Sequence, residues 1–229
     1  MLVLGFDTAT PAVSVALHDG KRVIAGASAL DARRHSELLA PMIAKVMADV
    51  GASRGDLTAV AVGVGPGPYT GLRVGLMTAR VLGSVLGLPV SGVCSLDVIA
   101  ACVPPGRAFL VATDARRKEV YWARYDAAGR RIAGPAVGQA SSIPGAAELA
   151  VAGAGGQLYP EAFGEVIGPA YPDAGTLCAI VARSPGLPPL LPAEPLYLRR
   201  PDAREPGPPK RVTPVSPGGT TPPDPPAGP

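Results

Sequence analysis

The sequence predicts a two-lobed α/β protein with a mixed sheet at the centre of each lobe. Short apolar strands alternate with amphipathic helices over the first hundred residues. A strand that ends in an acidic turn and returns as a second strand occurs twice, near Asp7 and again near Asp114. The chain has 229 residues, 47% of them hydrophobic, which is enough for a sizeable core.

The N-terminal part is predicted to form three strands and a helix. Apolar and alternating patterns place strands at residues 2–6, 13–17 and 22–27. A helix begins near Ser36 and stops at Gly51, and it accommodates Pro41 only near its first turn. Its apolar face comprises Leu39, Met42, Ile43, Val46, Met47 and Val50.

A second helix follows a buried strand at 57–64 and a glycine-rich loop, with Thr70 as its expected N-cap. A strand at 89–93 and a short helix at 95–102 complete the first lobe. Small residues recur at every fourth position of the second helix, namely Gly71, Gly75, Ala79, Gly83 and Gly87.

The small-residue stripe has two interpretations. A glycine inside a helix costs about 1 kcal/mol relative to alanine, so close backbone approach should offset the loss. The stripe could pack on this chain's own sheet or against a helix of another subunit. Leucines at 72, 76, 82 and 86 already supply an apolar face for the core, which favours the subunit interpretation. The predicted interface comprises Leu39, Met42, Val46, Gly71, Leu72, Gly75, Leu76, Ala79, Arg80 and Gly83.

The second lobe is expected over residues 106–200, after a first lobe at 1–105. Strands at 109–114 and 119–125 enclose a basic turn, and a weakly patterned region leads to a helix at 173–183 and a last strand around 196–198. From Pro201 onward 11 of 29 residues are proline, so residues 201–229 are expected to be a disordered extension.

Composition excludes several classes of protein. A net charge of +3, with three Phe and one Trp, is too little for an autonomous nucleic-acid binder, so any RNA contact should be shared with a partner. The odd count of three cysteines without ligand spacing is typical of reduced thiols in the cytoplasm. No basic region precedes the apolar start, and the longest uncharged run is shorter than a membrane helix needs, so neither a signal peptide nor a membrane segment is expected.

The repeated hairpin with Asp-Thr is the layout of the actin, sugar-kinase and chaperone ATPase fold, and the sequence resembles the TsaB family within it. The resemblance is carried by Gly5-Phe6-Asp7-Thr8-Ala9-Thr10, Ser14-Val15-Ala16, His35-Ser36-Glu37, Gly65-Pro66-Gly67-Pro68-Tyr69-Thr70-Gly71-Leu72-Arg73-Val74-Gly75, Asp114-Ala115-Arg116, Glu119-Val120-Tyr121-Trp122-Ala123 and Pro195-Leu196-Tyr197-Leu198-Arg199. The chain departs from the family at Pro68-Tyr69, where Ser-Phe is usual. It also departs in the second lobe, where the region between residues 134 and 195 is short and matches the family only loosely.

This resemblance implies a non-catalytic subunit of the bacterial machinery that places threonylcarbamoyl on the adenosine beside the tRNA anticodon. The implied partners are a TsaD-like catalytic subunit, a TsaE-like ATPase, and tRNA only through the complex. In the absence of the catalytic subunit, the same surface is expected to form a homodimer. No cofactor, metal or catalytic residue is expected in the chain itself.

Residues of the first hairpin are the candidates for a position near a nucleotide: Asp7, Thr8 and Thr10. For Asp7 and Thr8 the favoured interpretation is nevertheless a turn at the end of the strand, in which the side chains bond local backbone amides. The second hairpin has basic residues and no glycine where a phosphate would approach the backbone, and its basic tip is expected to be simply solvated. A glycine-rich turn at 153–156 could face an adenine. An autonomous ATP-dependent small-molecule kinase therefore remains the alternative function.

A metal site is not predicted. The catalytic relative TsaD has His-x-x-x-His on the helix that corresponds to Ser95-Leu96-Asp97-Val98-Ile99 here, and neither imidazole is present. His18 and His35 lack partner ligands at helical spacing and are expected to be surface or capping residues. A metallopeptidase is disfavoured for the same reason.

Overall fold

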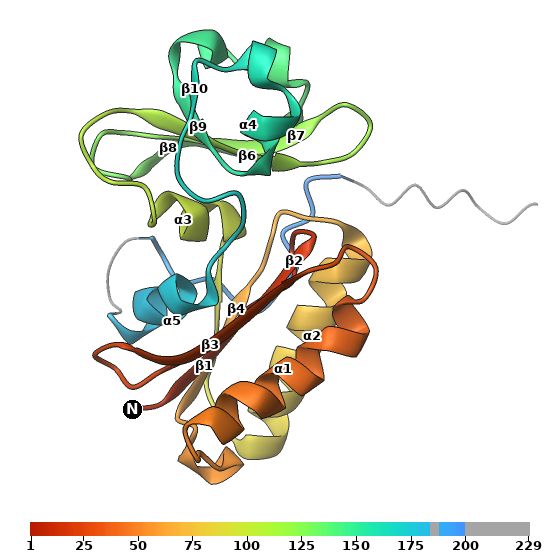
Figure 1. The fold of residues 1–229 in the computed structure, drawn as a ribbon, viewed down its shortest axis with the longest axis vertical. Helices are drawn as coiled ribbons and strands as arrows, with labels where there is room; N and C mark the ends of the chain where they lie inside the picture. Colours follow the sequence, from red (N-terminus) through yellow and green to blue (C-terminus); the bar gives the residue numbers. More distant parts are fainter. Residues whose placement is uncertain (184–187, 200–229) are drawn as a thin grey trace, which may run out of the picture.

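The computed structural model describes residues 1–183 and 188–199, which form two lobes around two five-stranded sheets (Figure 1). The strand order is β3-β2-β1-β4-β5 in the first sheet and β10-β9-β6-β7-β8 in the second. Both sheets contain parallel and antiparallel pairs, which confirms the predicted α/β class with mixed sheets. The predicted extension at 201–229 lies outside the described residues.

The first sheet is centred on β1, which pairs with β2 in antiparallel and with β4 in parallel orientation. Because side chains alternate along a strand, Leu4 and Phe6 face one side of the sheet and Val3 faces the other. The strands are β1 (Val3–Asp7), β2 (Ala12–His18), β3 (Val23–Leu30), β4 (Ala59–Gly63) and β5 (Val90–Val93).

Helices cover both faces of this sheet. α1 (His35–Asp49) and α2 (Tyr69–Leu86) lie on one face, and α5 (Ala174–Ala182) lies on the other (Figure 1). A Cβ added at Gly5 would lie 2.3 Å from Cys178 Sγ, so the glycine permits the close approach of α5. Burial raises the pKa of the Cys178 thiol to about 12, as expected for an apolar packing group.

The second sheet is centred on β6, which pairs with β7 and β9. Its strands are β6 (Phe109–Asp114), β7 (Val120–Tyr125), β8 (Arg131–Gly138), β9 (Ala150–Ala152) and β10 (Glu165–Val166). Apart from α3, described below, its helical cover among the described residues consists of α4 (Ala154–Leu158) and the short 3-10 turns Ala140–Ser142, Ala146–Glu148 and Pro160–Ala162. A further 3-10 turn, Arg54–Asp56, lies in the first lobe.

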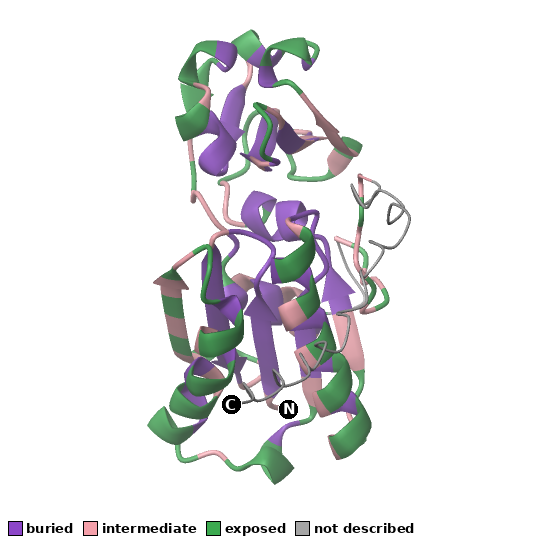
Figure 2. Ribbon diagram, turned by 90° about the vertical axis from the view of Figure 1, so that its right-hand side faces the viewer, coloured by how far each residue is buried: buried purple, intermediate pink, exposed green. Residues whose placement is uncertain are grey.

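The short helix α3 (Ser95–Ala100) joins the lobes and is buried along its whole length (Figure 2). Its Leu96 and Ile99 pack on Phe109 and Val111 of β6, so α3 follows the first sheet in sequence but belongs to the core under the second. The lobes are therefore connected by a shared apolar cluster as well as by the chain.

The chain returns to the first lobe after the second sheet. α5 packs on Val3 and Ala16, and Leu191 pairs with Gly92 beside β5. The predicted second lobe at 106–200 thus supplies its last part to the first lobe. Among the described residues, no helix combines the length and apolarity that crossing a membrane requires.

Most predicted elements are confirmed within a few residues, and three local predictions are wrong. α2 begins at Tyr69 after Pro68, so Thr70 lies in its first turn and is not the N-cap. Pro41 lies beyond the first turn of α1, on its exposed side. Residues 196–198 form no strand, although Leu196 N–H donates to Val64 O, because this single bond is not continued into a ladder. β8 was not predicted.

Candidate functional site

The glycine stripe of α2 faces the interior of this chain, which corrects the predicted subunit interface. A Cβ at Gly71 would lie 2.5 Å from Thr8 O, and one at Gly75 would lie 2.5 Å from Thr8 Oγ1. A Cβ at Gly83 would meet Val90 Cγ2 at 2.3 Å. These three glycines therefore admit the β1–β2 turn and β5 to the helix backbone, whereas Gly87, the last residue of the stripe, is exposed.

The remaining predicted contact residues are also interior, with one exception. Leu39, Met42, Val46, Leu72, Leu76 and Ala79 are each at most 9% exposed and belong to one core cluster. Arg80 alone is exposed. Successive helical residues are 100° apart, so the leucine and glycine stripes together form one broad buried face rather than two opposite faces.

Asp7 ends β1 at the boundary between the lobes and is 1% exposed. Its Oδ1 accepts from Ala9 N–H at 2.7 Å, and its Oδ2 accepts from Ser95 Oγ at 2.6 Å. Burial raises the pKa of Asp7, and these two bonds oppose that rise. Gly63 leaves room for the carboxylate, since a Cβ there would lie 1.8 Å from Oδ2.

The two threonines of this turn also bond within the chain. Thr8 Oγ1 donates to Gly71 O at 2.7 Å and accepts from Gly75 N–H at 3.1 Å, which joins the turn to α2. Thr10 Oγ1 accepts from Ala12 N–H at 3.3 Å. The interpretation that the side chain bonds a local backbone amide is confirmed for Asp7, which accepts from Ala9 N–H. Thr8 bonds the distant backbone of α2 instead of a local amide. Ser95, which completes the network, was missed by sequence reasoning, although it begins the helix directly after β5.

The corresponding turn in the second lobe, Asp114–Glu119, has a strained backbone. Arg116, Arg117 and Lys118 have φ values of 61°, 55° and 62°, in the left-handed region. This conformation costs roughly 1–2 kcal/mol for each L-residue with a side chain. All three side chains are exposed. The tip is thus exposed, and its conformation is one that glycine would adopt more easily.

Hydrogen bonds around the turn hold this conformation. Ala115 N–H donates to Glu119 O, and Glu119 N–H donates to Arg116 O, both at 3.0 Å. Asp114 Oδ1 accepts from Arg116 N–H at 2.7 Å. Residues 195–199 form what we call the C-terminal segment. From this segment, Arg199 Nη1 donates to Ala115 O at 2.8 Å, and the same guanidinium pairs with Glu119. The turn is therefore fixed by its own hydrogen bonds and by Arg199 from one distant segment.

Two clefts lie where the turns of the two lobes face each other. One, of about 210 Å³, is lined by Thr10 and Pro11 from the first lobe and by Thr113, Asp114 and Tyr171 from later segments. Thr113 Oγ1 is buried there without a hydrogen-bond partner among the described residues. The other cleft, of about 220 Å³, lies between the N-terminal ends of α1 and α2, and both Arg33 and Arg116 line it.

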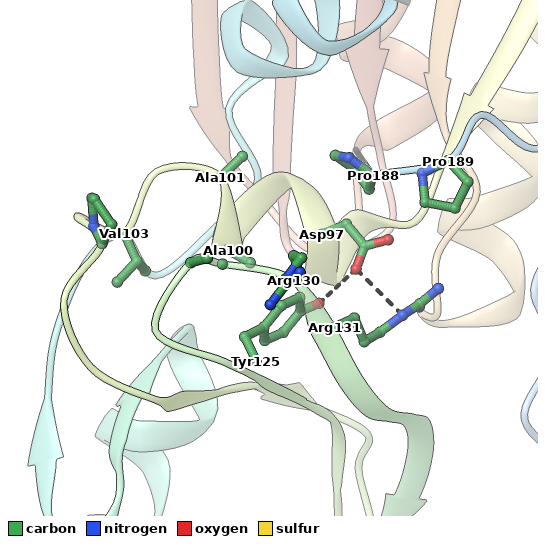
Figure 3. A pocket seen from close by; sticks show the side chains of 12 residues that line it. Asp97, Ala100, Ala101, Val103, Tyr125, Arg130, Arg131, Pro188 and Pro189 are labelled. Atoms are coloured by element: carbon green, nitrogen blue, oxygen red, sulfur yellow. Dashed lines mark hydrogen bonds and ion pairs between the residues drawn. The ribbon is translucent and has the colours of Figure 1, made fainter. Parts of the chain in front are cut away.

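A larger cavity of about 590 Å³ lies at the junction beside α3 (Figure 3). Asp97 is 3% exposed on its wall, accepts from Tyr125 OH at 2.7 Å and pairs with Arg131 at 3.6 Å. Burial raises the pKa of Asp97, and the tyrosine and arginine oppose that rise. This cluster ties α3 to the β7–β8 hairpin.

Both histidines are buried, so of the two expected roles, surface or capping residue, the surface position is wrong. His18 Nδ1 accepts from Gly20 N–H at 3.0 Å, a local capping role, and His35 Nε2 lies 2.7 Å from Thr10 O. Among the residues that the structure describes, no three His, Cys, Asp or Glu side chains are grouped as metal ligands. Each histidine instead orders a turn of the first lobe.

An aromatic pair, also missed by sequence reasoning, lies at the start of α2. The rings of Tyr69 and Tyr197 stack with centroids 5.3 Å apart. The Arg73 guanidinium lies 4.0 Å from the Tyr69 ring centroid, and its Nε donates to Tyr197 OH at 3.2 Å. The pair joins the C-terminal segment to α2.

The architecture defines a two-lobed α/β protein. In the turn of its first lobe, the side chains of Asp7 and Thr8 are hydrogen-bonded within the chain. A family model described as TsaD, tRNA N6-adenosine threonylcarbamoyltransferase, matches residues 29–161. The chain belongs to this family, since the match covers more than half of it.

Several relatives are TsaB proteins. tRNA threonylcarbamoyladenosine biosynthesis protein TsaB of Escherichia coli is 41% identical over 128 residues, and that of Bacillus subtilis is 35% identical over 129 residues. Each alignment covers 55% of this chain and 55% of the relative, so the chain spans about half the length of these TsaB proteins.

Two further comparisons extend over most of the chain. An uncharacterized protein of Mycobacterium tuberculosis is 46% identical over 209 residues, which cover 88% of this chain and 93% of that protein. The solved structure of YeaZ from Pseudomonas aeruginosa has a TM-score of 0.72 and 29% identity, with coverage of 86% of this chain and 99% of that one. The fold is therefore that of YeaZ.

Proposed function

We propose that this chain is a non-catalytic subunit in the biosynthesis of threonylcarbamoyladenosine on tRNA, and that it binds a TsaD-like catalytic subunit in the cytoplasm. The names of its TsaB relatives support the process. The first hairpin supports the non-catalytic role, because Asp7 and Thr8 are engaged by Ser95, Gly71 and Gly75 of the same chain. A TsaE-like ATPase would join the assembly.

The observation that carries the proposal is an apolar stripe on the exposed face of α2. Met77, Val81 and Val85 follow one another at intervals of four residues and are 55%, 54% and 76% exposed. Arg80 lies beside them and is also exposed. An exposed apolar row on a helix whose other face is anchored in the core is typical of a helix-to-helix contact with a partner. Without the catalytic subunit, two copies would pair through the same row.

A first experiment tests the process. Depletion of the protein from its host, followed by digestion of tRNA to nucleosides and mass spectrometry, should show a fall in threonylcarbamoyladenosine. Expression of the wild-type chain should restore the level. An unchanged level in a host without a redundant paralogue would overturn the proposal.

A second experiment tests the α2 row. Val81→Glu should abolish co-purification with the catalytic subunit, because a charge would be buried in an apolar contact. The matched control is Ile132→Glu, since Ile132 is 59% exposed on β8 and lies outside the row. Melting should be compared at low protein concentration, where a homodimer adds no stability by mass action. Equal co-purification of both variants would move the interface elsewhere.

The alternative of an autonomous small-molecule kinase has its own discriminating measurement. Isothermal titration of Mg-ATP into the isolated chain should give no tight binding, because the second turn presents basic side chains and no glycine to a phosphate. Tight binding by the chain alone would favour the kinase.

A further inference from the structure

A cationic and aromatic surface borders the 220 Å³ cleft. It adjoins the α2 row, because Tyr69 and Arg73 continue the four-residue spacing of Met77, Val81 and Val85 toward the N-terminal end of the helix. Arg33 and Arg116 line this cleft together with Pro68 and Thr70, the two neighbours of Tyr69. The second turn therefore faces the start of α2. We call this surface the cleft-mouth patch, and it comprises Arg33, Tyr69, Arg73, Arg116, Arg117, Lys118 and Tyr197.

The C-terminal segment makes the patch one surface. Tyr197 stacks on Tyr69, and two residues later Arg199 donates to Ala115 O inside the second turn. The aromatic pair and the basic tip are thus held to the same short segment. Their relative position is set by hydrogen bonds and stacking on both sides of the cleft.

Positive charge dominates the patch. Arg33, Arg73, Arg116, Arg117 and Lys118 are all exposed. The two carboxylates of the turn are engaged, since Asp114 pairs with Arg116 at 3.4 Å and Glu119 pairs with Arg199. A polyanion that follows this surface would meet several cations in succession, and it would release counterions on binding.

The aromatic pair adds a second kind of recognition. Tyr69 is 43% and Tyr197 is 37% exposed, so each ring keeps an accessible part while the stack fixes its orientation. Arg73 lies over the Tyr69 ring, which adds a cation to the platform. Fixed aromatic rings beside cations bind unstacked bases, whereas a duplex offers its bases only at their edges.

We propose that the cleft-mouth patch binds a single-stranded nucleic-acid segment, with its phosphates on the basic turn and a base on the tyrosine pair. The choice of RNA over DNA rests on the proposed function. An acidic protein would contact the cations and not the aromatic pair. The tyrosines should therefore contribute to the affinity for a nucleic acid but not to the affinity for an acidic protein.

The test measures fluorescence anisotropy of a fluorescein-labelled single-stranded RNA of about fifteen nucleotides, a site size suited to such surfaces, with the full-length chain. Arg116→Gln, Arg117→Gln and Lys118→Gln together should weaken binding at least about tenfold and reduce the slope of log affinity against log salt by about 2. Tyr197→Leu should weaken binding of this RNA about fivefold and leave binding of the matching duplex unchanged.

The matched control removes two cations at the opposite end of the first lobe. Lys21 and Arg22 are both exposed in the turn that follows β2. The last residue of β2, His18, pairs with Val3 at the start of β1, whereas the cleft lies beyond the end of β1, where Thr8 and Thr10 line it. The double substitution Lys21→Gln and Arg22→Gln should leave RNA affinity unchanged.

Three results would overturn the inference. One is equal RNA affinity of the triple variant and the control. Another is equal weakening by both, which would indicate general charge attraction. The third is polyglutamate competition as strong as that of RNA with no effect of Tyr197→Leu, which would indicate an acidic protein partner.

Failure of this inference is distinguishable from failure of the proposed function. If the triple variant restores threonylcarbamoyladenosine in depleted cells and binds RNA like the wild type, only the patch is refuted. If depletion leaves the nucleoside unchanged while the patch variants lose RNA affinity, the patch stands as a nucleic-acid surface and the proposed function falls.

Discussion

The turns at Asp7 and at Asp114 occupy corresponding places in the two lobes, yet they are built in opposite ways. Each follows the central strand of a five-stranded sheet and leads into an antiparallel partner. The first is buried and bonded to α2 and α3. The second is exposed, basic and strained over three residues. The same topological position thus serves as a structural joint in one lobe and as a surface in the other.

The difference follows from how each sheet is covered. α1, α2 and α5 enclose the first sheet on both faces, and the N-terminal part of α2 reaches the turn through Gly71 and Gly75. The second sheet carries only short helical cover, and among the residues that the structure describes no helix closes over Arg116 to Lys118. Helix packing at a turn leaves no room for a ligand, whereas an uncovered turn remains available for one.

The largest expected effect comes from filling the space beside the first turn. Gly63→Ala would place a Cβ 1.8 Å from Asp7 Oδ2, so the buried carboxylate or β4 would have to move. We expect a loss of about 3 kcal/mol in the free energy of unfolding, measured by urea denaturation. Gly138→Ala is the control, because a Cβ there meets nothing within 4 Å. Equal stability of the two variants would contradict the packed joint.

Removal of the hydroxyl that bonds Asp7 should have a smaller effect. Ser95→Ala leaves a buried carboxylate oxygen without its donor, which we expect to cost about 2 kcal/mol. Ser142→Ala, in a 3-10 turn at an exposed position, should be near neutral by comparison. A loss no greater than that of the control would show that the bond adds nothing to the joint.

The pH dependence of stability tests whether the carboxylate of Asp7 is buried in the first turn. The pKa of Asp7 is raised above 3.8 in the folded chain, so the native state holds its proton more tightly than the unfolded state. Its stabilising contribution is therefore present below the unfolded pKa and is lost as pH rises through the folded value. The unfolding free energy of the wild type minus that of Asp7→Asn should fall as pH increases from about 4 to 7. A difference independent of pH would contradict the raised pKa.

The sequence predicts the periodic elements well, because the apolar spacing of α1 and the alternation of β1 and β2 directly reflect burial. The sequence predicts poorly which residues pack against the small-residue stripe of α2. Gly71, Gly75 and Gly83 require a close neighbour, but spacing does not say whether this neighbour is Thr8 and Val90 or another subunit. Likewise, no local signal brings Tyr197 to Tyr69 or Arg199 to Ala115, since these contacts depend on the return of the chain.

The smallest expected effect, and the only gain, concerns the second turn. Lys118→Gly should relieve the left-handed conformation at φ 62°, although glycine also increases the entropy of the unfolded chain. The net result should be a stabilisation of about 1 kcal/mol in urea denaturation. Lys21→Gly, an exposed position outside the left-handed region, should instead destabilise slightly. If Lys118→Gly also destabilised, the strain in the second turn would be absent in solution. If Lys118→Gly both stabilised the chain and weakened RNA binding, the sequence would keep an exposed cation at a position where the backbone favours glycine. At the first turn, by contrast, Gly63→Ala and Ser95→Ala should both lower stability.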